Sequence, residues 1–226
     1  MNRDLLQTRF ADTDLYVVIT ESFCAGRSAL ETLAQCLAAG VKLVQMREKQ
    51  LNDRELLELA RAYRDATREA GALFIVDDRV DIALAAQADG VHLGQSDMPV
   101  ADARRIAPYL LLGASSHSQE EALSAQDAGA DYVNIGPIFE TQTKEVSSGA
   151  VGPQLIAELA PHLHIPFTCM GGIKPENMHV VLDQGARILA VVTAVTAAAD
   201  QQAAARALRK QLIAGRKQEH DNRASS

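Results

Sequence analysis

The chain has 226 residues, 47% of them hydrophobic, and a formal net charge of −7. This charge excludes a protein that binds nucleic acid or an anionic membrane through a basic surface. Neither 18 consecutive apolar residues nor a basic segment before an apolar one is present, so we expect neither membrane insertion nor export. Cys24, Cys36 and Cys169 form neither a zinc pattern nor an even disulfide framework, and we expect a cytoplasmic protein.

Eight apolar, β-rich runs recur along the chain, each followed by a polar turn and a helical stretch. The runs cover residues 15–20, 43–47, 73–76, 90–93, 111–115, 132–135, 167–170 and 188–192. The helical stretches cover residues 28–39, 53–70, 79–88, 100–107, 118–128, 153–160, 175–184 and 200–214. This alternation predicts an α/β protein, a single-domain (β/α)8 TIM barrel over residues 1–215. We expect the charged segment 216–226 to be a disordered tail.

Polar residues follow the carboxyl ends of these runs, which a parallel barrel gathers on one rim, where its active site lies. At the second run, Gln45, Arg47 and Lys49 alternate with period two and so project from one face. Val44 and Met46 occupy the opposite face, as expected beneath covering helices. We therefore expect the polar side chains to face inward, toward an anionic ligand. The alternative is an exposed strand edge with solvated charges.

Carboxylates follow the next two runs. Asp77 and Asp78 come directly after the third run, and Asp97 follows the fourth. On a basic rim they suit Mg²⁺, which proteins usually hold through one or two carboxylates together with substrate phosphate oxygens and water. The alternative is that Asp78 caps the helix that begins near Arg79 and Asp97 caps the helix after Pro99.

Two histidines lie near the expected rim. His117 comes just past the fifth run, where it is placed to act as an acid or a base, whereas His92 lies within the fourth run and is interpreted as a structural residue. The remaining histidines are interpreted as surface residues: His162, His164, His179 and His220.

The last three rim loops carry groups that bind oxyanions. Thr141, Thr143 and Lys144 cluster in the loop after the sixth run. A Gly-Gly pair at 171–172 and the segment 192–194 follow the seventh and eighth runs, the positions at which this fold recurrently binds phosphate with backbone N–H groups and the start of a short helix. Tight turns explain most Gly-Gly pairs, so the position in the eightfold order carries this prediction.

Taken together, the motifs resemble those of the thiamine phosphate synthase (thiamine-phosphate pyrophosphorylase) family, over residues 15–196. The resemblance rests on VQMREK at 44–49, DDRVD at 77–81, GVHLGQSDMP at 90–99, GPIFETQTK at 136–144 and GGI at 171–173. It implies a transferase that joins a hydroxymethylpyrimidine diphosphate to a hydroxyethylthiazole phosphate and releases diphosphate. It also implies a requirement for Mg²⁺ and small phosphorylated heterocycles as partners. A homo-oligomer is left open.

The resemblance also assigns roles to individual residues. Contacts to the pyrimidine diphosphate are implied for Gln45, Arg47, Lys49, Asp77, Ser115 and Lys144. Magnesium ligation is implied for Asp78 and Asp97. Contacts to the thiazole phosphate are implied for Thr141, Thr143, Gly172, Val192 and Thr193. We expect a dissociative, magnesium-assisted substitution in which Arg47, Lys49 and Lys144 stabilise the departing diphosphate.

The chain departs from the family pattern at three positions. Asp77 replaces a usual Asn, so an acceptor stands where the family has a group that can also donate. Glu140 replaces a usual Pro, and Thr193 replaces Ser while keeping the hydroxyl.

Two alternative functions keep the same fold. One is a thiazole tautomerase that uses His117, and the other is a non-catalytic regulatory barrel that binds thiamine phosphate, which Asp77 supports.

Overall fold

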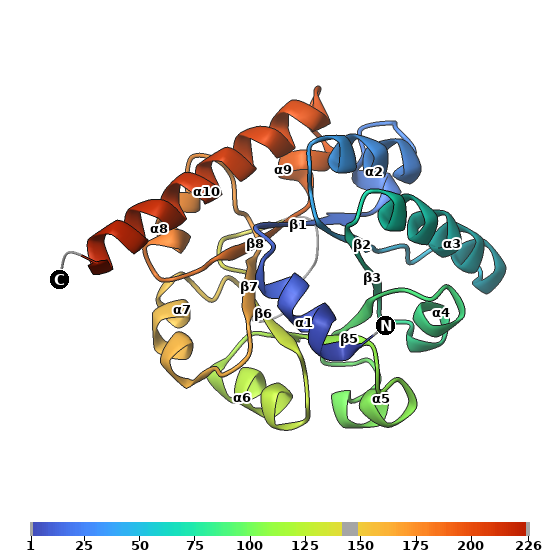
Figure 1. Ribbon diagram of the computed structural model, residues 1–226, viewed down its shortest axis with the longest axis horizontal. Coiled ribbons are helices and arrows are strands. Elements are labelled where there is room, and N and C mark those ends of the chain that lie inside the picture. The colour runs from blue at the N-terminus through green and yellow to red at the C-terminus, as the bar shows by residue number, and fades with distance from the viewer. Residues whose placement is uncertain (1, 142–148, 225–226) are drawn as a thin grey trace.

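A computed structural model of the chain describes residues 2–141 and 149–224, with side chains as far as residue 215. Within these residues, eight parallel strands follow one another in chain order and close into a barrel, with helices around it (Figure 1). The ring closes because β1 pairs with both β2 and β8. The predicted (β/α)8 barrel is therefore confirmed.

The strands start and end within one residue of the predicted runs. They are β1 (Leu15–Ile19), β2 (Leu43–Met46), β3 (Leu73–Asp77), β4 (Gly90–Leu93), β5 (Leu111–Ser116), β6 (Tyr132–Ile135), β7 (Phe167–Met170) and β8 (Ile188–Val191). Side chains alternate as the sequence indicates. Leu43 belongs to the cluster inside the barrel, whereas Val44 and Met46 belong to the cluster beneath the helices. Gln45 shares the inward face with Leu43.

Helices follow the strands around the barrel. They are α2 (Ala29–Ala38), α3 (Asp53–Glu69), α4 (Val80–Ala85), α5 (Val100–Ile106), α6 (Gln119–Asp127), α7 (Gln154–Leu159), α8 (Met178–Leu182), α9 (Thr193–Thr196) and α10 (Gln201–Ala224), with short 3-10 turns at η1 (Glu21–Phe23) and η2 (Ala160–His162). Ser28 with Glu31, and Asn52 with Glu55, form capping boxes that satisfy the first N–H groups of α2 and α3.

An additional helix, α1 (Arg3–Ala11), closes the amino-terminal end of the barrel, over the centre of the strand ring in Figure 1. Its Leu6 and Phe10 side chains are buried in the cluster inside the barrel, and the Phe10 ring stacks on Tyr132 with ring centroids 4.2 Å apart. The side chains of Arg3 and Gln7 bind the Asp131 carboxylate, which precedes β6. The opposite, carboxyl end of the barrel is therefore the end that offers pockets.

The last helix differs from the prediction. Helix α10 continues to Ala224, whereas the sequence analysis ends this helix at residue 214 and expects a disordered tail from 216. The segment beyond 214 contains Arg, Lys, Gln and Glu, which favour helix, and it contains no proline that would end one. Among the described residues, no helix combines the length and the apolar character needed to cross a membrane.

Candidate active site

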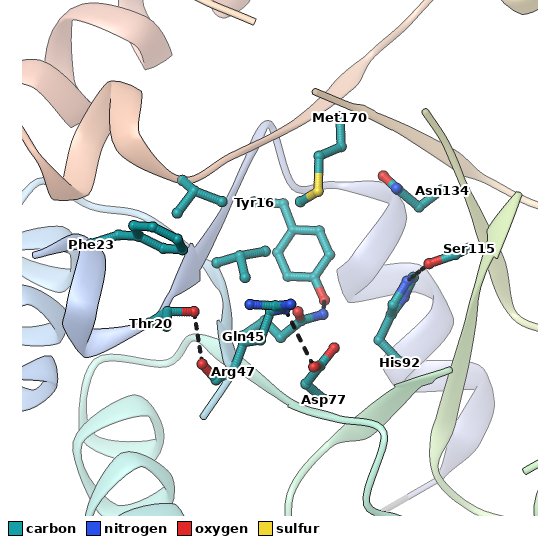
Figure 2. Close-up of a pocket in the computed structure, with 12 residues that line it drawn as sticks. Tyr16, Thr20, Phe23, Gln45, Arg47, Asp77, His92, Ser115, Asn134 and Met170 are labelled. Atoms are coloured by element: carbon teal, nitrogen blue, oxygen red, sulfur yellow. Dashed lines mark hydrogen bonds and ion pairs between the residues drawn. The ribbon is translucent and has the colours of Figure 1, made fainter. Parts of the chain in front are cut away.

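Two adjoining pockets open at the carboxyl end of the barrel. The first, which we call the inner pocket, is lined by Tyr16, Val18, Thr20, Phe23, Gln45, Arg47, Asp77, His92, Ser115, Asn134, Met170 and Val192 (Figure 2). The second, which we call the loop pocket, is lined by Phe23, residues 140–141, Met170, residues 171–174 and residues 190–194. Phe23, Met170 and Val192 line both pockets, so the two spaces share a wall.

Arg47 lies at the rim of the inner pocket because pairing of β2 with β1 continues past Met46. The Arg47 N–H donates to the Ile19 carbonyl oxygen at 2.9 Å, and the Thr20 hydroxyl donates to the Arg47 carbonyl oxygen at 2.7 Å (Figure 2). The Arg47 guanidinium is 3.6 Å from an Asp77 carboxylate oxygen. The backbone of Arg47 is therefore fixed while its cationic end faces the pocket.

Lys49 pairs with two carboxylates at the same rim. Its ammonium group is 2.6 Å from an Asp77 oxygen and also pairs with Asp78. Burial alone would lower the pKa of Lys49, but the charges and hydrogen bonds of Asp77 and Asp78 outweigh it and raise the pKa above its usual value. Lys49 is therefore positively charged at neutral pH. The interpretation of residues 45–49 as an exposed strand edge is wrong, because β2 pairs with β1 on one side and β3 on the other.

Asp78 and Asp97 place two carboxylates side by side. Asp78 has a left-handed backbone with φ of +59°, and its N–H donates to the His92 carbonyl oxygen at 2.8 Å, so its position depends on the end of β4. The Asp97 carboxylate accepts from the Gly94 N–H at 2.6 Å. Burial and the adjacent Asp78 carboxylate raise the pKa of Asp97. Two neighbouring carboxylates of this kind favour a bound cation.

The alternative that these aspartates cap helices is wrong. Helix α4 begins after Arg79 and α5 begins after Pro99, and neither has a side-chain cap. The donor set of Asp78 and Asp97 consists of oxygen atoms only, which fits Mg²⁺ when substrate oxygens and water complete the shell. The described residues contain no cluster of three or more His, Cys, Asp or Glu side chains arranged for a metal, as an all-protein site would need.

The loops after β6 and β7 pack against each other and build the loop pocket. The Phe139 N–H donates to the Gly171 carbonyl oxygen at 3.0 Å. Gly172 has φ of +61°, and a Cβ on it would lie 2.6 Å from the Glu140 carbonyl oxygen. The Gly-Gly pair is therefore required both by the turn and by the close approach of the neighbouring loop. Helix α9 begins at Thr193, at the edge of the same pocket.

The structure brings most of the predicted site residues together. Gln45, Arg47, Asp77 and Ser115 line the inner pocket. Thr141, Gly172, Val192 and Thr193 line the loop pocket. Lys49 and Asp78 join them through Asp77, and Asp97 through Asp78. Thr143 and Lys144 lie outside the described residues, so their roles stay predictions.

Some pocket residues escaped the sequence analysis. Tyr16, Phe23, Asn134 and Met170 line the inner pocket without having been singled out, and His92, interpreted as structural, lines it too. For Asn134 a signal was present, because it shares the inward face of β6 with Tyr132 at period two.

His117 does not join these pocket residues. Its Nδ1 lies 2.9 Å from a Glu121 carboxylate oxygen, and it lines neither the inner pocket nor the loop pocket.

Fold and site together define a single-domain barrel enzyme whose mouth combines a cationic and acidic rim with two pockets that share a wall. Comparison with known proteins gives the family. A model of the thiamine monophosphate synthase family matches residues 15–195. The chain belongs to this family, whose members are transferases.

Similar proteins agree over most of the chain. The thiamine-phosphate synthase of Moorella thermoacetica is 46% identical over 198 residues, which cover 87% of this chain and 94% of that protein. The thiamine-phosphate synthase of Chloroflexus aurantiacus is also 46% identical over 198 residues, with 88% and 92% covered. The structure of a thiamine phosphate pyrophosphorylase from Pyrococcus furiosus has a TM-score of 0.85 and 38% identity, and covers 93% of this chain and 98% of that one.

Proposed function

We propose that this protein joins 4-amino-2-methyl-5-hydroxymethylpyrimidine diphosphate to 4-methyl-5-(2-hydroxyethyl)thiazole phosphate, giving thiamine phosphate and diphosphate. The observation that carries the proposal is the wall shared by the inner pocket and the loop pocket. Two heterocycles held in the two pockets would meet beside Phe23, Met170 and Val192, which line both, and a bond between the rings can form there. Membership of the thiamine monophosphate synthase family supports the choice of substrates.

The reaction explains why the site is built from charges. The bond between the pyrimidine methylene carbon and the diphosphate oxygen breaks, and its electron pair leaves with diphosphate. The lone pair of the thiazole ring nitrogen forms the new carbon–nitrogen bond. That nitrogen has no proton to lose, so the step needs no general base. In a dissociative path, electron donation from the pyrimidine amino group supports a transient methylene cation.

The rim supplies the charges that the leaving group needs. Arg47 and Lys49 would stabilise the negative charge that develops on the departing diphosphate, and preorganised donors of this kind are each worth roughly 3 to 4 kcal/mol. Lys144 is proposed to act with them. Asp78 and Asp97 are proposed to hold Mg²⁺, which when bound supplies positive charge to the diphosphate. Lys49 keeps Asp77 and Asp78 paired at the rim.

The loop pocket is proposed to bind the thiazole phosphate. Backbone N–H groups at the Gly-Gly turn and hydroxyl groups on the facing loops are suited to phosphate oxygens. The contributing residues are Thr141, Gly172, Val192 and Thr193 from the described part of the chain, together with Thr143. This arrangement would aim the thiazole ring at the inner pocket.

The structure favours the synthase over both alternatives. A tautomerase that uses His117 would need that ring at the ligand, but His117 binds Glu121 outside both pockets. The regulatory barrel drew support from Asp77 in place of Asn. Asp77 is paired with Lys49, so its charge is neutralised within the site rather than left to repel a diphosphate. The three cysteines are free thiols, which fits the cytoplasm that we propose as its compartment.

A coupling assay tests the proposal. The purified protein is incubated with both substrates, with Mg²⁺ omitted and then restored, and the release of diphosphate and the formation of thiamine phosphate are followed together. We expect equal amounts of both products, only when both substrates are present, and a large loss of rate without Mg²⁺. Binding of thiamine phosphate without turnover would instead establish the regulatory barrel.

A further inference from the structure

Five side chains from five strands form a continuous hydrogen-bond chain across the barrel interior. The Gln45 Nε2 is 2.6 Å from the Tyr16 hydroxyl, which is 3.1 Å from the Tyr132 hydroxyl. The Tyr132 hydroxyl is 3.1 Å from His92 Nδ1, and His92 Nε2 is 3.0 Å from the Ser115 hydroxyl. The two ends of this hydrogen-bond chain, Gln45 and Ser115, line the inner pocket (Figure 2). Tyr132 is fully buried and does not line it.

The chemistry of the donors gives this chain a direction. An amide nitrogen can only donate, so Tyr16 accepts from Gln45 and has one hydrogen to place. Burial raises the pKa of both Tyr16 and Tyr132, so both hydroxyls keep their protons. Among the described residues, the Tyr132 hydroxyl is the acceptor within reach of the Tyr16 proton. If Tyr16 donates to Tyr132 rather than into the inner pocket, which it also lines, the Tyr132 hydroxyl donates in turn to His92 Nδ1.

The direction of these hydrogen bonds also determines the role of Ser115, at the other end of the hydrogen-bond chain. When His92 Nδ1 accepts a hydrogen bond from Tyr132, the neutral ring carries its hydrogen on Nε2, which donates to the Ser115 oxygen. Ser115 then accepts inside the protein, and its own proton is available to the pocket. In the opposite direction the hydrogen is on Nδ1, and the Ser115 hydroxyl donates to Nε2. Ser115 would then offer the pocket an oxygen lone pair in place of a proton.

The fold holds Tyr132 in place from two sides. The Phe10 ring of α1 stacks beneath it, with ring centroids 4.2 Å apart. Gly113 on β5 makes room for it from the side, because a Cβ on Gly113 would overlap the Tyr132 ring and hydroxyl. The glycine and the closing helix thus both serve the position of a tyrosine that lies beneath the pocket.

We propose that this buried chain fixes His92 as its Nε2–H tautomer and thereby presents Ser115 to the pocket as a hydrogen-bond donor. Tyr132 is then a positioning residue, which acts on the ligand through His92 and Ser115. The ligand atom opposite Ser115 must be an acceptor, such as a ring nitrogen or an anionic oxygen. Its assignment to the pyrimidine substrate rests on the proposed function, whereas the tautomer does not.

The tautomer is measured in the unmodified protein. Histidine is labelled with ¹⁵N in the full chain, and the two ring nitrogens of His92 are assigned by their loss in His92→Gln. We expect a protonated Nε2 and an unprotonated Nδ1 at pH 7.5, and a mixture of tautomers in Tyr132→Phe, which loses the hydroxyl but keeps the ring. A protonated Nδ1 in the unmodified protein would overturn the proposal, whether or not the protein makes thiamine phosphate.

Kinetics separate positioning from a structural effect. Tyr132→Phe should raise the KM for the pyrimidine diphosphate about tenfold, the size expected for one weakened hydrogen bond to the substrate, with the KM for the thiazole phosphate unchanged. The matched control is Tyr63→Phe, because the Tyr63 hydroxyl is equally buried but donates to the Ala29 carbonyl oxygen outside the barrel. Equal KM values for the two variants would refute the positioning role, and the tautomer measurement decides the case if Tyr132→Phe does not fold.

Discussion

Asp97 lies where its negative charge lowers the stability of the fold. Its pKa is raised by burial and by Asp78, so the ionised carboxylate destabilises the fold at pH values above that folded-state pKa. Asp97→Asn should therefore raise the free energy of unfolding at pH 7 without metal, by about 0.5 kcal/mol. The gain should disappear below about pH 4, where the carboxyl is protonated in the unfolded chain as well.

The same substitution should impair the reaction. At limiting Mg²⁺, we expect Asp97→Asn to lower the rate of thiamine phosphate formation at least about tenfold. Asp102→Asn is the control, because the Asp102 carboxylate pairs with Arg105 within α5 and lines neither the inner pocket nor the loop pocket. An unchanged magnesium dependence in Asp97→Asn would remove the basis for the magnesium site.

At the residue scale, the sequence predicts charged site residues better than neutral ones. A charged side chain on the inward face of a strand needs a partner, so Arg47 and Asp77 could be predicted to lie in a site. Tyr16 and Tyr132 lie within apolar runs, where a tyrosine is read as core, and only the coordinates show that their hydroxyls meet. His92 was missed for the same reason.

At the scale of the element, α1 closes the barrel through one face only. Leu6 is buried inside the barrel, whereas its neighbour Leu5 is 53% exposed. We expect Leu6→Ala to lower the free energy of unfolding by about 2 to 5 kcal/mol. Leu5→Ala, the same truncation one position away, should cost less than about 0.5 kcal/mol. Denaturant unfolding of both variants measures this, and equal losses would show that α1 does not pack as described.

The loop after β7 is held by the loop after β6, and Gly172 is one of the points where the two loops approach closely. Gly172→Ala should push the Glu140 backbone away and raise the KM for the thiazole phosphate at least about tenfold. Gly185→Ala is the matched control, because Gly185 also has a positive φ but has no atom within 4 Å of an added Cβ. Gly185→Ala should lose about 1 to 2 kcal/mol of stability because of its positive φ, and Gly172→Ala should lose more because of the added clash. Equal KM values for the two variants would show that Gly172 does not contribute to binding of the thiazole phosphate.

The strands could be predicted almost to the residue because each is a short apolar run between turn residues, as at β4. Helix α1 could not, because it has few apolar residues and its burial depends on the open end of a barrel that forms elsewhere. The contact between Gly172 and Glu140 was likewise invisible, since it joins two loops more than 30 residues apart.

At the scale of the whole molecule, the strand topology determines where the site residues lie. Parallel strands in chain order bring groups from residues 45 to 193 to one end, and α1 closes the other. This gathering could be predicted from the eightfold repeat alone. The division of the mouth into two pockets with a common wall could not, because it depends on how Phe23, Met170 and Val192 pack.

The most direct test of the central claim is a crystal structure with thiamine phosphate, diphosphate and Mg²⁺ bound. We predict the pyrimidine ring in the inner pocket beside Ser115, the ester phosphate in the loop pocket beside Gly172 and Thr193, and diphosphate at Arg47 and Lys49. A product molecule bound away from these two pockets, or with both of its rings in one pocket, would contradict the account.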